Sequence, residues 1–126
     1  MMKYFISILV TCSIACNVYG QQDRVGEFKL QQEQMRKTAL LRELDSGVYF
    51  MDLGNYARAD EKFQHVLDNV KSVPSDLTFF FGKNSFNLGK YKQSIDWLNK
   101  YIQLKGTNGQ YSGEAVSLMR KAEAEF

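Results

Sequence analysis

The chain has 126 residues, 44% of them apolar and 24% charged, with 16 Lys and Arg against 14 Asp and Glu. This length suits one small domain rather than two, and a net charge of +2 indicates neither an acidic tail nor a nucleic-acid-binding surface. A single Pro favours a helical fold, while two Cys and one His exclude a cysteine-rich zinc site and a dense disulfide scaffold.

Residues 1–20 have the pattern of a secretory signal. Lys3 is followed by an uncharged, mostly apolar run from Tyr4 to Ala15 and then by a more polar end. A membrane-spanning helix needs about 20 apolar residues, and this run is shorter. We therefore exclude residues 1–20 from the fold and expect an exported protein, periplasmic or attached to the bacterial envelope.

The processing of this segment has three alternatives. Val18 and Gly20 are small enough for signal cleavage, so that the mature chain would begin after Gly20. Residues 13–16 (SIAC) resemble a bacterial lipobox, although Ser13 stands where Leu is usual, and Cys16 would then carry the lipid. The third alternative is an uncleaved anchor. We favour cleavage after Gly20, and on that interpretation the mature domain has no thiol.

Residues 21–39 form a polar amino-terminal segment. Val25, Phe28, Met35 and Ala39 keep an approximate helical spacing within it. The spacing predicts a helix that packs against the element that follows.

An internal repeat organises the rest of the chain. Sliding the sequence by 35 residues aligns residues 40–74 with residues 75–109. A period of this size is typical of stacked helical hairpins. The aligned pairs are Gly47 and Gly82, Leu53 and Leu88, Gly54 and Gly89, Tyr56 and Tyr91, Ala59 and Ser94, Phe63 and Leu98, and Leu67 and Ile102.

Each repeat also predicts two helices by its own pattern. In residues 40–74, two stripes of apolar residues at three- and four-residue spacing each predict a helix. Between them we expect a turn at Gly54 and Asn55, because Gly ends helices and Asn caps them. Residues 75–109 repeat this plan around Gly89. Residues 110–126 predict a capping helix, from about Ser112 to Glu125, that has no returning partner. The two stripes of the first repeat are Leu40, Leu44, Val48 and Met51, and then Tyr56, Ala59, Phe63, Val66 and Val70.

With these features the chain resembles the tetratricopeptide repeat (TPR) family from residue 40 to about 106. The resemblance implies an all-α fold of antiparallel helical hairpins, stacked as a short right-handed superhelix with flanking helices. Two positions depart from the family pattern, because Gly106 stands where a second boundary Pro is expected and Ser94 replaces Ala. The resemblance rests on Gly47 and Gly82, the Leu-Gly-x-Tyr turns at residues 53–56 and 88–91, Ala59 and Ser94, Phe63 and Leu98, and Pro74.

In this family the first helix of each hairpin lines a concave face that binds segments of partner proteins. The resemblance therefore implies a groove made from equivalent positions of the two repeats. Phe79, Phe80 and Phe81 cannot all face their own hairpin, since successive helical side chains are about 100° apart. Either a flanking helix covers the remaining ring, or that ring lines an aromatic docking groove. The groove residues so implied are Leu41, Leu44, Val48, Asp52, Asp76, Phe79, Lys83, Phe86 and Asn87.

The residues offer little for catalysis. His65 is the only imidazole, and the adjacent Asp60 and Glu61 point in different directions on a helix. No phosphate-binding loop, nucleophile motif or metal motif occurs. We therefore expect no enzyme, no cofactor and no bound metal.

The sequence thus predicts a protein–protein interaction module of the cell envelope, whose partner is another protein or a peptide segment. The alternative is a structural protein that self-associates into homo-oligomers. Nucleic acid is not expected as a partner, because Asp76 and Asp96 interrupt the lysines of the second repeat. Membrane attachment is expected only if Cys16 is lipidated.

Overall fold

A computed structural model describes the backbone of residues 2–126 and the side chains of residues 24–126. Within these residues the chain forms five α-helices and one short 3₁₀ turn, and no β-strand. The predicted all-α class is confirmed. The chain divides into two compact units, an amino-terminal unit, Met1–Thr38, and a hairpin unit, Ala39–Phe126.

The first helix, α1 (Met2–Asp52), continues through the boundary expected at residues 39 and 40. Residues 27–46 contain neither Gly nor Pro, so nothing in the local sequence ends the helix there. Two local contacts support this stretch. Arg36 pairs with Glu33 at 3.0 Å, and the Thr38 hydroxyl donates to the Gln34 carbonyl at 2.9 Å.

None of the described side chains of residues 24–38 is buried. Val25, Phe28 and Met35 are 56%, 60% and 72% exposed. The helix expected from this spacing is present, and its packing against the following element stays a prediction. The side chains of residues 1–20 lie outside the described residues, so signal cleavage after Gly20 and lipidation of Cys16 stay predictions.

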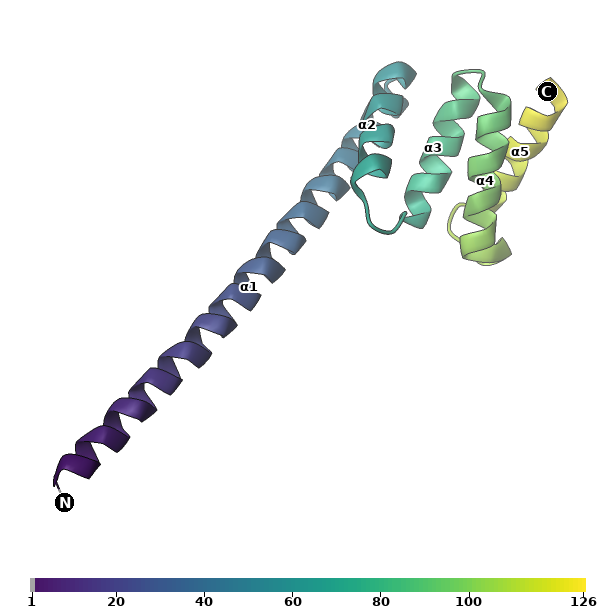
Figure 1. Cartoon of the computed structure of the whole chain (residues 1–126). Coiled ribbons are helices and arrows are strands. Elements are labelled where there is room, and N and C mark those ends of the chain that lie inside the picture. Colours follow the sequence, from purple (N-terminus) through teal and green to yellow (C-terminus); the bar gives the residue numbers. More distant parts are fainter. Residues whose placement is uncertain (1) are drawn as a thin grey trace. The chain divides into compact units, whose positions relative to one another are not determined.

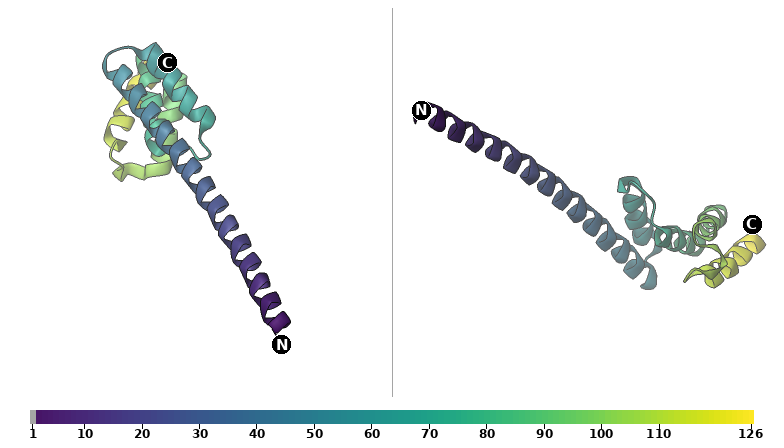
Figure 2. Two further views of the ribbon diagram at one scale, coloured as in Figure 1. Left: turned by 90° about the vertical axis from the view of Figure 1, so that its left-hand side faces the viewer. Right: turned by 90° about the horizontal axis from the view of Figure 1, so that it is seen from below.

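The hairpin unit continues with α2 (Tyr56–Asn69), α3 (Ser75–Asn87), α4 (Tyr91–Lys105), a 3₁₀ turn (Gly106–Asn108) and α5 (Ser112–Glu125). Consecutive helices run in opposite directions, with the turns after α1 and α3 at one end of the unit (Figure 1). α4 packs against both α3 and α5, and α3 also packs against α2. Figure 2 shows the same succession of helices in two further views.

The two tight turns of the hairpin unit have the geometry that the glycines predict. Gly54 and Gly89 adopt left-handed backbone angles, with φ of 79° and 75°. Side chains strain this conformation, so each glycine ends its helix and reverses the chain. Pro74 directly precedes α3, where its fixed φ and missing N–H fit the start of a helix.

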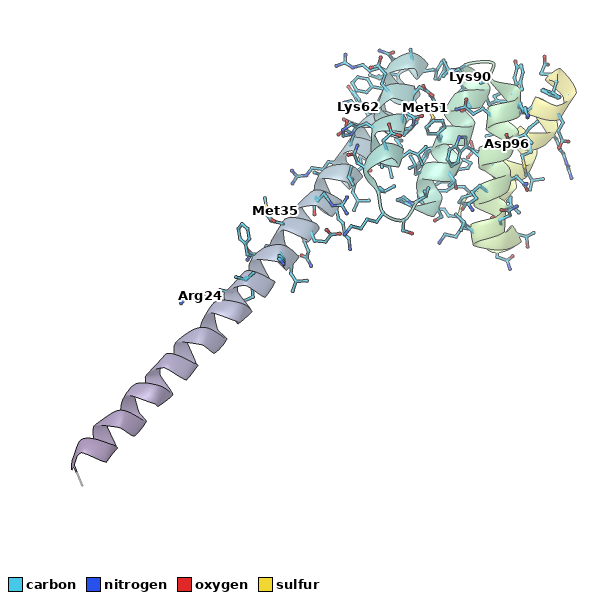
Figure 3. All side chains as sticks on the ribbon, in the orientation of Figure 1. Arg24, Met35, Met51, Lys62, Lys90 and Asp96 are labelled. Carbon is cyan, nitrogen blue, oxygen red and sulfur yellow. The ribbon has the colours of Figure 1, made fainter. Side chains whose placement is uncertain are left out.

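The buried side chains form two clusters. The first lies among α1, α2 and α3 and includes Met51, which is labelled in Figure 3. The second joins α3, α4 and α5. The first cluster contains Leu40, Leu44, Met51, Ala59, Phe63, Val66, Leu77 and Phe81, and the second contains Phe79, Leu98, Tyr101 and Ala115.

Candidate functional site

The two hairpins are closed by equivalent contacts between a glycine and a bulky side chain. A Cβ atom at position 47 would lie 2.5 Å from the Phe63 ring, and one at position 82 would lie 2.8 Å from Leu98 Cγ. Both distances are shorter than real carbon–carbon contacts, so each site requires a residue without a side chain. The repeat found in the sequence therefore corresponds to a repeated close approach between paired helices.

The small residues of the second helices stand at the same contacts. Ala59 and Ser94 are both fully buried. The Ser94 hydroxyl donates a 2.7 Å hydrogen bond to the Gly82 carbonyl. A residue larger than Ala or Ser would push the paired helices apart.

Six of the nine predicted groove residues fall into two equivalent rows. Leu41, Val48 and Asp52, the first row, share a sector of about 40° around α1. Leu41 and Asp52 are exposed, and Val48 is half-buried.

The second row, on α3, is formed by the three residues that align with the first row in the 35-residue repeat. It consists of Asp76, Lys83 and Asn87, of which Asp76 and Asn87 are exposed and Lys83 is half-buried. Lys83 Nζ lies 2.6 Å from Glu114 Oε1 on α5 and 6.0 Å from the centre of the Phe79 ring. The Lys83 charge is therefore already paired within the unit.

The other predicted groove positions are placed differently. Leu44 and Phe79 are core residues, only 6% and 1% exposed, and are not available to a partner in this structure. They are equivalent in the repeat and lie about 60° around their helices from Leu41 and Asp76, which turns them toward the core. Phe86 is half-buried and packs edge-to-face against Tyr91, with ring centres 5.6 Å apart.

Tyr111, just before α5, explains why Phe79 is covered. Its ring stacks on Phe79 with centres 4.4 Å apart and an angle of 4° between the planes. Phe80 meets the same tyrosine edge-to-face, while Phe81 packs between Phe63 and Trp97. All three phenylalanines thus have aromatic partners inside the unit, and an aromatic groove that includes Phe79 is not present.

The rows retain two acidic groups without a charged partner. Among the described residues, Asp52 and Asp76 form no ion pair. Because Lys83 is paired with Glu114, the unpaired charge of the two rows is negative. Together with the exposed Leu41, the rows thus carry both apolar area and acidity.

His65 occupies a structural position on the surface. Its Nδ1 lies 3.4 Å from Glu43 Oε2, while Lys62 Nζ lies 3.3 Å from Glu43 Oε1, so the three side chains bridge α1 and α2. Figure 3 labels Lys62 on α2. Among the described residues no three His, Cys, Asp or Glu side chains gather as metal ligands would.

Asn84 is a buried polar contact that the sequence pattern did not reveal. It is fully buried on α3, and its Nδ2 donates to the Tyr56 carbonyl on α2 at 2.9 Å. This bond connects the second hairpin to the first. Asn84 stands at the position of Tyr49 in the first repeat, which is exposed, so the alignment alone gave no signal for it.

Two further observations bear on the class of protein. Within the described part of the chain, no helix combines the length and the apolar character needed to cross a membrane. Comparisons with protein-family models, with curated proteins and with solved structures find no match.

Proposed function

We propose that this protein is an exported interaction module of the bacterial cell envelope. On this proposal, two TPR-like hairpins stack as a right-handed superhelix and hold a segment of another protein against the two rows. The observation that carries the proposal is the equivalence of the rows. In both repeats the same three positions are accessible, while the position about 60° away around the helix, Leu44 or Phe79, is buried.

The side chains of the rows indicate the chemistry of the segment. Leu41 and Val48 offer apolar area in the first row. Asp52 and Asp76 are unpaired and favour a cation, and Asn87 offers both a donor and an acceptor. A segment with an apolar residue close to a Lys or Arg fits this arrangement.

Export is part of the proposal and rests on residues 1–20. Cleavage after Gly20 gives a periplasmic or secreted domain, whereas lipidation at Cys16 attaches the domain to the membrane. Mass spectrometry of the mature protein distinguishes the two, since one begins at Gln21 and the other carries acyl chains on its first residue.

A photocrosslinking amino acid placed at Leu41 or at Asn87 tests the binding face. In cells that produce the protein, we expect a discrete crosslinked product from each position. Lys92 and Asn99, which are exposed on α4 outside the rows, serve as matched control positions and should not yield this product. Asp52→Lys combined with Asp76→Lys should remove the product without changing the helical circular dichroism. The same product from all four positions would contradict the proposal.

Self-association is the second candidate, because Phe126, directly after α5, is 79% exposed. A second copy stacked on this end would bury apolar surface. A photocrosslinking amino acid at Phe126 tests this second function through the mass of its crosslinked product. A product of twice the mass of the mature chain identifies self-association, and any other mass identifies a different partner.

A further inference from the structure

The amino-terminal unit carries an exposed apolar face on α1. Val25, Phe28, Gln32 and Met35 share a sector of about 80° around the helix. Each of the three apolar side chains is more than half exposed. Leu30, also exposed, lies on the opposite side of the helix and is not part of this α1 face.

Cations border the α1 face on both sides. Arg24 lies about 20° beyond one edge, and Lys29 lies about 40° beyond the other. Arg36 lies on the same side as Lys29 and is paired with Glu33 at 3.0 Å. Glu27 lies about 80° beyond the edge that Arg24 borders. An apolar stripe with cationic margins and acids farther around the helix is the pattern of helices that bind membrane surfaces.

A second copy fits the α1 face poorly. If Val25, Phe28, Gln32 and Met35 formed the core of a parallel two-stranded coil, Arg24 of one chain would approach Lys29 of the other. This pair is repulsive, and Gln32 would be buried in the seam. An anionic lipid surface accepts both cations and the apolar side chains together.

We propose that the α1 face docks on an anionic lipid surface, with the helix lying in the plane of the membrane. None of the described side chains of residues 24–38 is buried, so a lipid surface would supply the apolar contact that this segment lacks. The docking requires no acyl chain on Cys16 and is separate from partner binding on the hairpin unit.

Hydrogen–deuterium exchange of the mature chain that begins at Gln21, in the presence of lipid vesicles, tests this proposal. We expect slow exchange of residues 24–38 in vesicles of phosphatidylcholine mixed with phosphatidylglycerol. In vesicles of phosphatidylcholine alone, or at high salt, exchange should be faster because the attraction is electrostatic. The amides of α3 and α4 report the fold in every sample and should not change.

Variants with matched controls sharpen the test. Arg24→Glu combined with Lys29→Glu should lower the lipid-dependent protection by at least about 25-fold, since each lost surface cation removes about fivefold and each new acid adds repulsion. Lys92→Glu combined with Lys100→Glu makes the same change of net charge on α4 and should have little effect. Phe28→Gln should lower the protection, whereas Leu30→Gln on the opposite side should not.

Three outcomes would overturn the proposal. The first is equal protection of residues 24–38 in both kinds of vesicle. The second is an equal loss of protection in the α4 control variant. The third is protection that appears without vesicles and rises with protein concentration, which would assign the α1 face to a second copy of the chain.

Discussion

The two hairpins make the same close contact between paired helices with different side chains. In the first, Gly47 on α1 faces the ring of Phe63 on α2. In the second, Gly82 on α3 faces Leu98 on α4. Both bulky residues are fully buried. The position at which the two helices of a hairpin touch is therefore the same in both repeats, whereas the shape of the side chain at that contact differs.

The hairpins also differ beside this contact. Lys62 of the first hairpin pairs with Glu43, whereas the equivalent residue of the second is Trp97, whose ring centre lies 5.1 Å from that of Phe81. The smaller Leu98 thus has a large aromatic neighbour, while the larger Phe63 has a charged one. Trp97 packs against the first cluster and Leu98 lies in the second, so the two neighbouring residues fill different parts of the core.

The largest expected effect comes from filling the glycine contacts. Gly47→Ala and Gly82→Ala should each lower the free energy of unfolding by about 1–3 kcal/mol through overpacking. This loss should appear even though Ala is better than Gly in a helix by about 1 kcal/mol. We expect the larger loss at Gly82, because its Cβ would also lie 3.1 Å from the Leu98 backbone nitrogen. Urea unfolding measures both variants.

Gly113→Ala is the control for these two variants. A Cβ at position 113 would meet no atom within 4 Å, so this substitution should leave stability unchanged or raise it. Equal effects of all three substitutions would show that the close approaches do not limit the packing.

The features that sequence reasoning predicted are local. Gly54 and Gly89 determine the turns through their own backbone, and Pro74 marks the start of α3 in the same way. The predicted limits of the last helix, Ser112 and Glu125, agree with α5. Such features need only a few neighbouring residues, so a single sequence contains them.

The features that it missed depend on residues that do not follow the repeat. Phe79 is covered by Tyr111, which lies in the connection before α5, and Lys83 is neutralised by Glu114. Neither partner has an equivalent that the alignment of the two repeats could show. The family resemblance assigns Leu44 to the groove, although its place in the apolar stripe indicates the core.

A middle-sized effect is expected from exchanging the small residues of the second helices. Ser94→Ala should cost about 1 kcal/mol, because it removes the buried hydrogen bond to the Gly82 carbonyl. Ala59→Ser puts a hydroxyl at the equivalent place, where the repeat leads us to expect the Gly47 carbonyl as the acceptor. We expect Ala59→Ser to lower the free energy of unfolding by less than the roughly 1–3 kcal/mol that an unsatisfied buried hydroxyl costs. Urea unfolding of the two variants checks this, and a full penalty at Ala59 would show that the hairpins are not equivalent here.

The smallest expected effect lies at the turns, where the backbones match and only the side chains differ. Asn55 precedes α2 with φ −89° and ψ 71°, and its side chain accepts from the Arg58 N–H at 3.3 Å. Lys90 precedes α4 with φ −86° and ψ 69° but makes no such bond. Lys90→Asn should therefore cap α4 through the Gln93 N–H and raise stability by about 0.5–1 kcal/mol.

The reverse change, Asn55→Lys, should lower the free energy of unfolding by a similar amount. The chain that carries both substitutions should unfold near the urea concentration at which the parent chain unfolds. This exchange changes only the side-chain cap, because both positions are exposed. The backbone bonds stay the same: the Asn55 carbonyl accepts from the Ala59 N–H, and the Lys90 carbonyl accepts from the Ser94 N–H. A gain at Lys90 without a loss at Asn55 would mean that the second turn is the weaker of the two for a reason other than capping. Equal and opposite shifts would show that the two turns are interchangeable, as their backbone angles indicate.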